Sequence, residues 1–297
     1  MQVAPPRRSR TFGLTALTLV NVFWGLSFIA SKFALDAGMP PMTLAFARYV
    51  ITVAVMVPLT LARDKTLAIA RADWPAAALS ALVGITVYYY FEYTGMVYTT
   101  ASTASLILAS VPVFSLLYEA VFRRKRAGGL HWACVLVSLA GVFFVIAFGG
   151  KGLEGTGSLK GNLLILGCCL SWVAYIQINS GLRGKYASLR LTTWQSVFAA
   201  VTLLPFALME RAQWVPVPLA AWACVAALAL ICSGLCYFLY AEALSAVEPA
   251  TAALFININP IAAVIGGMLL LGERLYPLQW VGGALILISL FISNRKS

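Results

Sequence analysis

Apolar residues fall into ten runs of 19 to 26 residues, and the short segments between the runs hold most of the charged residues. A helix of about 20 apolar residues crosses the hydrocarbon core of a bilayer. The pattern therefore predicts an all-α integral membrane protein with ten transmembrane helices. We place the spans at residues 12–35, 41–62, 74–96, 100–122, 130–148, 159–181, 190–209, 218–243, 249–272 and 276–294.

Composition supports this class. Of the 297 residues, 61% are hydrophobic and 10% are charged, and the mean hydropathy is +0.89. A soluble domain has about a quarter charged residues, so a soluble enzyme with one anchor is excluded. The net charge of +11 sits in short clusters between the apolar runs. The placement of these charges indicates how the chain is oriented in the membrane. We therefore expect a lipid bilayer, and no nucleic acid, as partner.

The basic residues also predict the orientation. Fifteen lysines and arginines fall in the termini and the even-numbered loops, and four fall in the odd-numbered loops. Basic loops stay in the cytoplasm, so both termini are expected there, in the inner membrane of a bacterium. The first run is too long for a signal peptide and is expected to be retained as a helix.

The two halves of the chain resemble each other at an offset of 148 residues. The matched pairs are Trp24 and Trp172, Pro112 and Pro260, Arg126 and Arg274, Leu130 and Leu278, and Trp132 and Trp280. We therefore predict a five-helix repeat at 12–148, a glycine-rich linker at 149–161 and a second five-helix repeat at 162–294. Five helices is an odd number, so the second repeat must be inverted in the membrane, as in many secondary transporters.

Two segments, Thr94–Leu117 and Ala241–Leu275, each contain a small-residue loop followed by a helix with a proline. They resemble the EamA-type branch of the drug/metabolite transporter superfamily, which includes YddG-type amino-acid exporters. The resemblance implies ten helices in two inverted repeats and alternating access through a central cavity. One departure concerns Glu273, whose aligned position in the first half is Lys125.

Ionisable residues inside a membrane usually face the protein interior or a cavity. Arg48 lies about seven residues into the second run, where it could hold a substrate carboxylate. The alternatives are an ion pair with a neighbouring helix or snorkelling. Glu92 lies in the most aromatic stretch, and it could line a cavity, neutralise Arg48 or bind an amino group.

Other polar and aromatic residues share helical stripes or the ends of broken helices. We predict that the substrate contacts Asn21, Trp24, Phe28, Arg48, Tyr89, Glu92, Trp172, Tyr175, Asn179, Tyr237 and Asn257. Pro112 and Pro260 are expected to remove a backbone hydrogen bond and to kink their helices for gating. Glu242, near the cytoplasmic end of its helix, is expected to form a gating or interfacial ion pair.

These features predict a secondary transporter that exports small metabolites, with amino acids as the expected substrates. The alternative is an exporter of lipophilic or aromatic cations, which the aromatic residues and Glu92 would suit. One histidine and no clustered aspartates argue against an enzyme, and we expect no cofactor and no bound metal. The pattern is compatible with a monomer and leaves the oligomeric state open, as it does proton coupling.

Overall fold

The computed structural model of the protein describes residues 9–123, 128–148, 156–182, 184–244, 246–247, 252 and 255–295, and within these ranges the regular structure is helical. The first predicted repeat contains α1 (Arg10–Asp36), α2 (Pro41–Asp64), η1 (Arg71–Asp73), α3 (Trp74–Ala81), η2 (Leu82–Val87), α4 (Tyr88–Tyr98), α5 (Ala101–Leu108), α6 (Val111–Phe122) and α7 (Gly129–Ala147). The second contains α8 (Thr156–Ser180), α9 (Ser188–Met209), η4 (Arg211–Gln213), α10 (Leu219–Ala227), η5 (Leu228–Leu235), α11 (Cys236–Leu244), α13 (Ile258–Leu270) and α14 (Pro277–Arg295).

Seven helical segments are long and apolar enough to cross a membrane. They are Arg10–Asp36, Pro41–Asp64, Arg71–Tyr98, Ala101–Phe122, Leu159–Ser180, Ser188–Met209 and Leu219–Leu244. Three shorter apolar helices, Trp132–Ala147, Ile258–Leu270 and Pro277–Ile292, lie within the other three predicted spans. The chain is thus an all-helical, multi-pass membrane protein, and the crossing of all ten segments stays a prediction.

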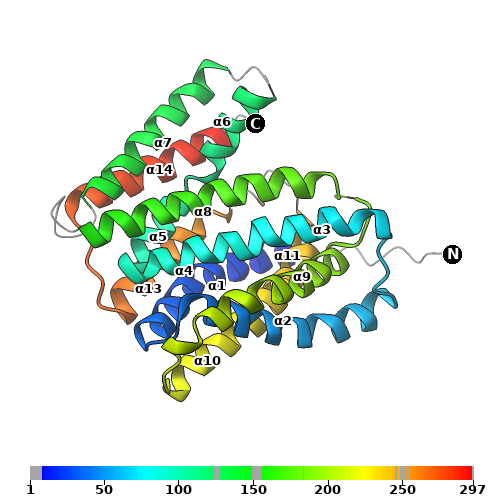
Figure 1. Ribbon diagram of the computed structural model, residues 1–297. Helices are drawn as coiled ribbons and strands as arrows, with labels where there is room; N and C mark the ends of the chain where they lie inside the picture. Colours follow the sequence, from blue (N-terminus) through cyan, green and yellow to red (C-terminus); the bar gives the residue numbers. More distant parts are fainter. Residues whose placement is uncertain are drawn as a thin grey trace.

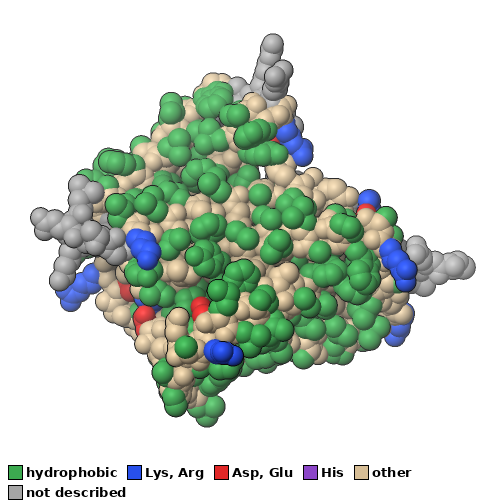
Figure 2. Space-filling model, in the orientation of Figure 1, with side chains coloured by type: hydrophobic (Ala, Val, Ile, Leu, Met, Phe, Trp, Pro, Cys, Tyr) green, Lys and Arg blue, Asp and Glu red, His purple; other side chains and the backbone are tan. Residues whose placement is uncertain are grey.

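The surface agrees with this class. Hydrophobic side chains cover most of the face shown in Figure 2, and lysines and arginines lie toward the ends of the helices. Large apolar side chains such as Leu136, Phe143 and Val201 are each more than 60% exposed. An apolar surface of this extent is stable in lipid and would aggregate in water.

Helices from opposite predicted repeats pack in pairs. α7 packs along α14 at one edge of the bundle, α2 along α9, α1 along α13 and α4 along α8 (Figure 1). The two halves are therefore interlocked, because each pair takes one helix from each half. The largest buried apolar cluster also contains residues of both halves, from Phe28 in α1 to Leu290 in α14.

Two of the long helices contain a π-helical segment. η2 separates α3 from α4, and η5 separates α10 from α11. Their first residues, Leu82 and Leu228, are 146 positions apart, close to the offset that relates the two halves. A π turn widens the helix, weakens its regular hydrogen bonding and is frequent at functional sites.

The two predicted proline kinks are helix breaks instead. Pro112 lies in the first turn of α6, after a break at Ala109 and Ser110, and Pro260 lies in the first turn of α13. A backbone N–H in the first turn has no partner within its helix, so neither proline removes a helical hydrogen bond. The expected loss of a helical hydrogen bond is thus not seen, both prolines mark the points where the helices restart, and their role in gating stays a prediction.

The predicted linker is shorter than expected from its glycines. Residues 149–155 lie outside the described residues, and 156–161 belong to α8. Gly161 lies against α4, where an added methyl group would come within 2.8 Å of the Gly95 carbonyl oxygen and 2.9 Å of the Tyr98 Cβ. This glycine therefore permits close packing of two helices.

Candidate functional site

Arg48 lies in α2 and is buried, with 6% of its surface exposed. Its Nε donates to the Ser233 hydroxyl in η5 at 3.1 Å, and its Nη1 donates to the Tyr93 hydroxyl in α4 at 2.9 Å. The guanidinium carbon lies 5.0 Å from the centre of the Tyr89 ring. Arg48 is thus held between helices, which contradicts the snorkelling alternative.

Arg48 forms no ion pair with any carboxylate of the described residues. The ion-pair alternative for this residue was therefore also wrong. A buried charge without a direct ion pair is costly, and tyrosine hydroxyls and ring faces offset only part of that cost. The arrangement favours an anionic group from outside the chain, because a guanidinium binds a carboxylate through strong, charge-assisted hydrogen bonds.

Aromatic rings extend from Arg48 across α2, α4 and α8. The Tyr49 ring lies 5.7 Å from Tyr89, Tyr88 lies 5.1 Å from Tyr89 and 5.3 Å from Trp172, and Trp172 lies 4.9 Å from Tyr175. Rings at these separations attract each other beyond their buried area. Tyr89, Trp172 and Tyr175 of the predicted site are therefore brought together.

Trp24 belongs to a second aromatic group. Its ring lies 5.8 Å from Tyr237 and 5.4 Å from Tyr240 in α11, and its Nε1 donates to the carbonyl oxygen of Cys232 at 3.1 Å. Cys232 is in the π segment η5, where carbonyl groups are available to side chains. The predicted residues Trp24 and Tyr237 thus contact each other across the two halves.

The other π segment is bound in a related way. The Ser171 hydroxyl of α8 donates to the Val83 carbonyl oxygen in η2 at 2.6 Å. Ser171 and Trp24 lie in the first helices of the two predicted repeats, and each donates to the π segment of the opposite half. The irregular backbone of both segments is therefore stabilised by contacts between the halves.

Glu92 is buried in α4, with 5% of its surface exposed. It lies one turn after Tyr88 and next to Tyr93, the partner of Arg48. No ion pair joins Glu92 to Arg48 in the part of the chain that the structure describes. The three roles considered for this acid, which are lining a cavity, neutralising Arg48 without direct contact and binding an amino group, all stay predictions.

A buried polar network joins α3, α8 and α9. The Gln195 amide nitrogen donates to the Ser80 hydroxyl at 2.8 Å and to Asn179 Oδ1 at 3.1 Å. Tyr175 donates to Gln195 Oε1 at 3.4 Å and accepts from Asn179 at 3.3 Å. Gln195 was missed in the sequence, although the 148-residue offset aligns Arg48 with its neighbour Ser196.

The remaining predicted contacts are more dispersed. Asn21 is fully buried, its Nδ2 donates to the Leu17 carbonyl oxygen at 2.8 Å, and its Oδ1 has no hydrogen-bond partner. Phe28 is part of the main apolar cluster. Asn257 is half-buried in the turn before α13. No hydrogen bond or ring contact of the described residues joins these three side chains to Arg48, and their contact with substrate stays a prediction.

Glu242 forms a contact between the halves at the end of the bundle where α1 begins, which we call the near side. Its Oε1 lies 2.6 Å from Arg63 Nη2, and the Arg63 guanidinium lies 5.2 Å from the centre of the Phe238 ring. The pair joins the last turn of α2 to α11. On the same side, the hydrogen bond from Lys185 to Asp73 (2.8 Å) raises the pKa of Lys185 above its usual value.

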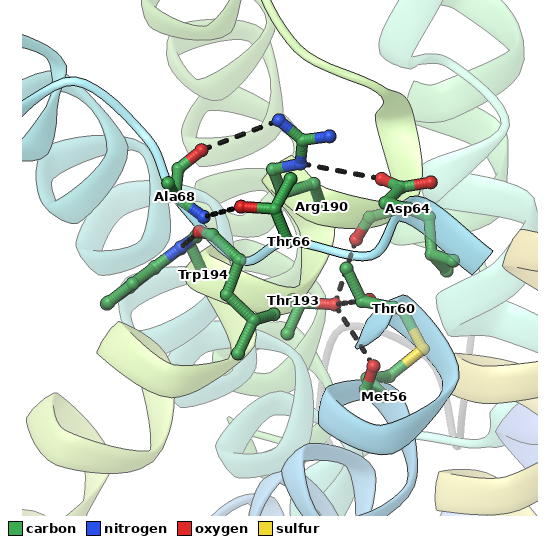
Figure 3. A network of polar contacts seen from close by, with 10 residues as sticks. Met56, Thr60, Asp64, Thr66, Ala68, Arg190, Thr193 and Trp194 are labelled. Carbon is green, nitrogen blue, oxygen red and sulfur yellow. Dashed lines mark hydrogen bonds and ion pairs between the residues drawn. The ribbon is translucent and has the colours of Figure 1, made fainter. Parts of the chain in front are cut away.

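Figure 3 shows the contacts that join α2 to α9 on the near side. The Thr60 and Thr193 hydroxyls are hydrogen-bonded at 2.7 Å, and Arg190 Nε lies 3.5 Å from Asp64 Oδ2. Neither Arg190 Nε nor Asp64 Oδ2 has a hydrogen-bond partner. A different nitrogen of the same guanidinium, Arg190 Nη1, donates to the Ala68 carbonyl oxygen at 3.5 Å. The near-side end of the α2–α9 pair is therefore held by a long ion pair.

At the opposite end of the bundle, the far side, two glutamates of the second half form hydrogen bonds with the first half. Glu210 accepts from the Met42 and Thr43 backbone N–H groups at 3.0 and 2.7 Å, in the first turn of α2. Glu273 accepts from the Ala101 and Ser102 N–H groups at 2.8 and 2.9 Å, in the first turn of α5. Each carboxylate satisfies unpaired N–H groups and the positive end of a helix dipole.

Replacing Glu273 with alanine should lower the free energy of unfolding by about 0.5–2 kcal/mol, the cost of losing a helix cap. Thermal denaturation in detergent, followed by loss of the monodisperse peak in gel filtration, would measure this. Asp36→Ala is the control, because Asp36 is mostly exposed and pairs with Lys32 on the same side. Equal stability of Glu273→Ala and the control would show that the Glu273 cap does not contribute to the free energy of unfolding.

The helical fold, the extensive apolar surface and a buried polar site shared by two interlocked halves define a membrane transporter. The EamA-like transporter family matches twice, at residues 11–147 and 159–295, and the chain belongs to this family. Its members are transporters, a class that is generally not enzymatic.

Curated relatives match over almost the whole chain. An uncharacterized transporter of Archaeoglobus fulgidus is 26% identical over 97% of this chain and 98% of its own length. A protein of Streptantibioticus cattleyicolor named as a probable terminal-alkyne amino-acid exporter is 30% identical over 95% of this chain and 93% of its own. A crystal structure that is 22% identical covers 96% of both chains with a TM-score of 0.65, which supports the fold.

Proposed function

We propose that the protein exports amino acids and that Arg48 binds the substrate carboxylate. The observation that carries this proposal is the burial of the Arg48 guanidinium between α2, α4 and η5 without a carboxylate partner among the described residues. The relative named as an amino-acid exporter supports the same substrate class.

The surroundings of Arg48 suit the rest of such a ligand. Tyr89, Tyr88 and Trp172 form a continuous aromatic surface beside the guanidinium, which would contact an apolar side chain. Glu92, on the same helix as Tyr88 and Tyr89, would bind the amino group. An amino acid carries a carboxylate, an amino group and a side chain on one carbon atom, and Arg48, Glu92 and the aromatic surface would each bind one of them.

The transport mechanism we propose is alternating access by ten helices in two inverted repeats of five. The paired π segments and the paired helix breaks at Pro112 and Pro260 support the duplication. Inverted repeats bind substrate near the midplane and open to each side in turn. The Arg63–Glu242 pair would be a near-side gate, on the side that the basic loops predict to be cytoplasmic.

Export of lipophilic cations is the second candidate, supported by the aromatic rings and the buried Glu92. Amino-acid export requires the charge of Arg48, and cation export does not, because a buried guanidinium repels a cation. The two functions therefore predict opposite responses when Arg48 loses its charge.

Counterflow in proteoliposomes tests the proposal. Proteoliposomes that contain the purified protein and are preloaded with unlabelled amino acids should accumulate labelled amino acids with large apolar side chains. Protein-free liposomes with the same contents should not. The corresponding amides and quaternary ammonium ions should compete poorly for uptake. Exchange of cations alone would contradict amino-acid transport and favour the second candidate.

A further inference from the structure

The guanidinium of Arg48 has five N–H donors, and the structure shows how two of them are used. Nε donates to Ser233 and Nη1 donates to Tyr93, while Nη2 has no partner among the described residues. The Tyr89 ring lies against the group at 5.0 Å. Three N–H donors therefore remain for a ligand, one on Nη1 and two on Nη2, and Nη2 is the nitrogen with both of its N–H groups unused.

The two partners of Arg48 are themselves held in place. Tyr93 is fully buried and also accepts from the Ser31 hydroxyl of α1 at 3.4 Å. Ser233 is buried in the π segment η5, next to Cys232, whose carbonyl oxygen accepts from Trp24. Because an arginine side chain has many rotamers, two fixed oxygen atoms restrict the guanidinium to one orientation.

We propose that Ser233 and Tyr93 are positioning residues that orient Arg48 Nη2 toward the carboxylate of the substrate. This inference rests on the proposed function and extends it to a residue of the second half. Ser233 reaches Arg48 from a helix whose regular turns are interrupted by η5, so the π segment contributes directly to recognition. The site thereby depends on both halves of the chain.

Counterflow with L-phenylalanine and its carboxamide tests the assignment. Ser233→Ala should raise the KM for phenylalanine on the order of tenfold, the factor that 1.4 kcal/mol represents, with the maximal rate retained. Tyr93→Phe should have an effect in the same direction. Exchange of the carboxamide should change less than twofold, because it has no carboxylate for Arg48 to bind.

Two comparisons separate positioning from a structural role. In the Arg48→Met background, Ser233→Ala should have no further effect on the KM for phenylalanine, since it acts through Arg48. Ser196→Ala is the matched control, because this buried hydroxyl donates only to the Thr192 carbonyl oxygen of its own helix. It should leave the preference for acid over amide unchanged.

The outcomes also separate this inference from the proposed function. If Ser233→Ala impairs acid and amide equally, or adds to Arg48→Met, the positioning role is wrong while the carboxylate role of Arg48 stands. If Arg48→Met itself leaves the preference for phenylalanine over its amide unchanged, both the proposed function and the positioning role are overturned.

Discussion

Replacing Arg48 with methionine should lower kcat/KM for amino-acid exchange about 10- to 100-fold. Hydrogen bonds to a charged group contribute roughly 1.5–3 kcal/mol, and each 1.4 kcal/mol corresponds to a factor of ten. Methionine retains much of the apolar volume and loses all five donors. The measurement is counterflow of labelled amino acids in proteoliposomes with equal amounts of incorporated protein.

Loss of folding would not explain this result. Arg48 forms no ion pair with a carboxylate of the described residues, so its removal breaks no ion pair, and the cost of burying its charge disappears. The thermal stability of Arg48→Met should therefore equal or exceed that of the wild-type protein. A stable variant with unchanged amino-acid exchange would refute the carboxylate role.

Replacing Gly25 with alanine should destabilise the contact between α1 and α13. The added methyl group would collide with the Asn259 carbonyl oxygen and lie 2.7 Å from the Ala262 Cβ and 3.0 Å from the Ala263 nitrogen. Backbone atoms cannot rotate away as a side chain can, so the helices must separate. Overpacking typically costs about 1–3 kcal/mol, and we expect the upper part of this range.

The same gel-filtration assay of thermal denaturation would measure the effect of Gly25→Ala. Gly129→Ala is the control, because a methyl group on Gly129 has no neighbour within 4 Å. The control should melt at the wild-type temperature or slightly above it. A wild-type melting temperature for Gly25→Ala would mean that α1 and α13 do not approach this closely.

The candidate site was only partly predictable. Arg48 and Trp24 stood out because a charge or an indole deep in an apolar run is unusual, and both have contacts that join the halves. Ser233 and Gln195 did not stand out, since neither side chain carries a charge or an aromatic ring. Their importance comes from neighbours more than 100 positions away along the chain.

Some sequence signals were read with the wrong physical cause. Glu273 was noted for its place in a family motif, and its carboxylate caps α5 from a distance of 171 and 172 residues along the chain. Gly161 suggested a flexible linker because glycine lacks a side chain, and the same property allows it to pack against α4. Local composition cannot distinguish these uses of one residue.

The sequence by itself determined the class of the protein. The length of the apolar runs, the placement of charge and the internal similarity can each be read from one segment or from two aligned segments. The family match at residues 11–147 and 159–295 confirms that the chain belongs to the EamA-like transporter family, as the sequence predicted. Tertiary structure alone decided that Arg48 is bound by Ser233 and Tyr93 and forms no ion pair with a carboxylate of the described residues, and that each half stabilises the π segment of the other. These contacts join distant residues, and packing in three dimensions selects them.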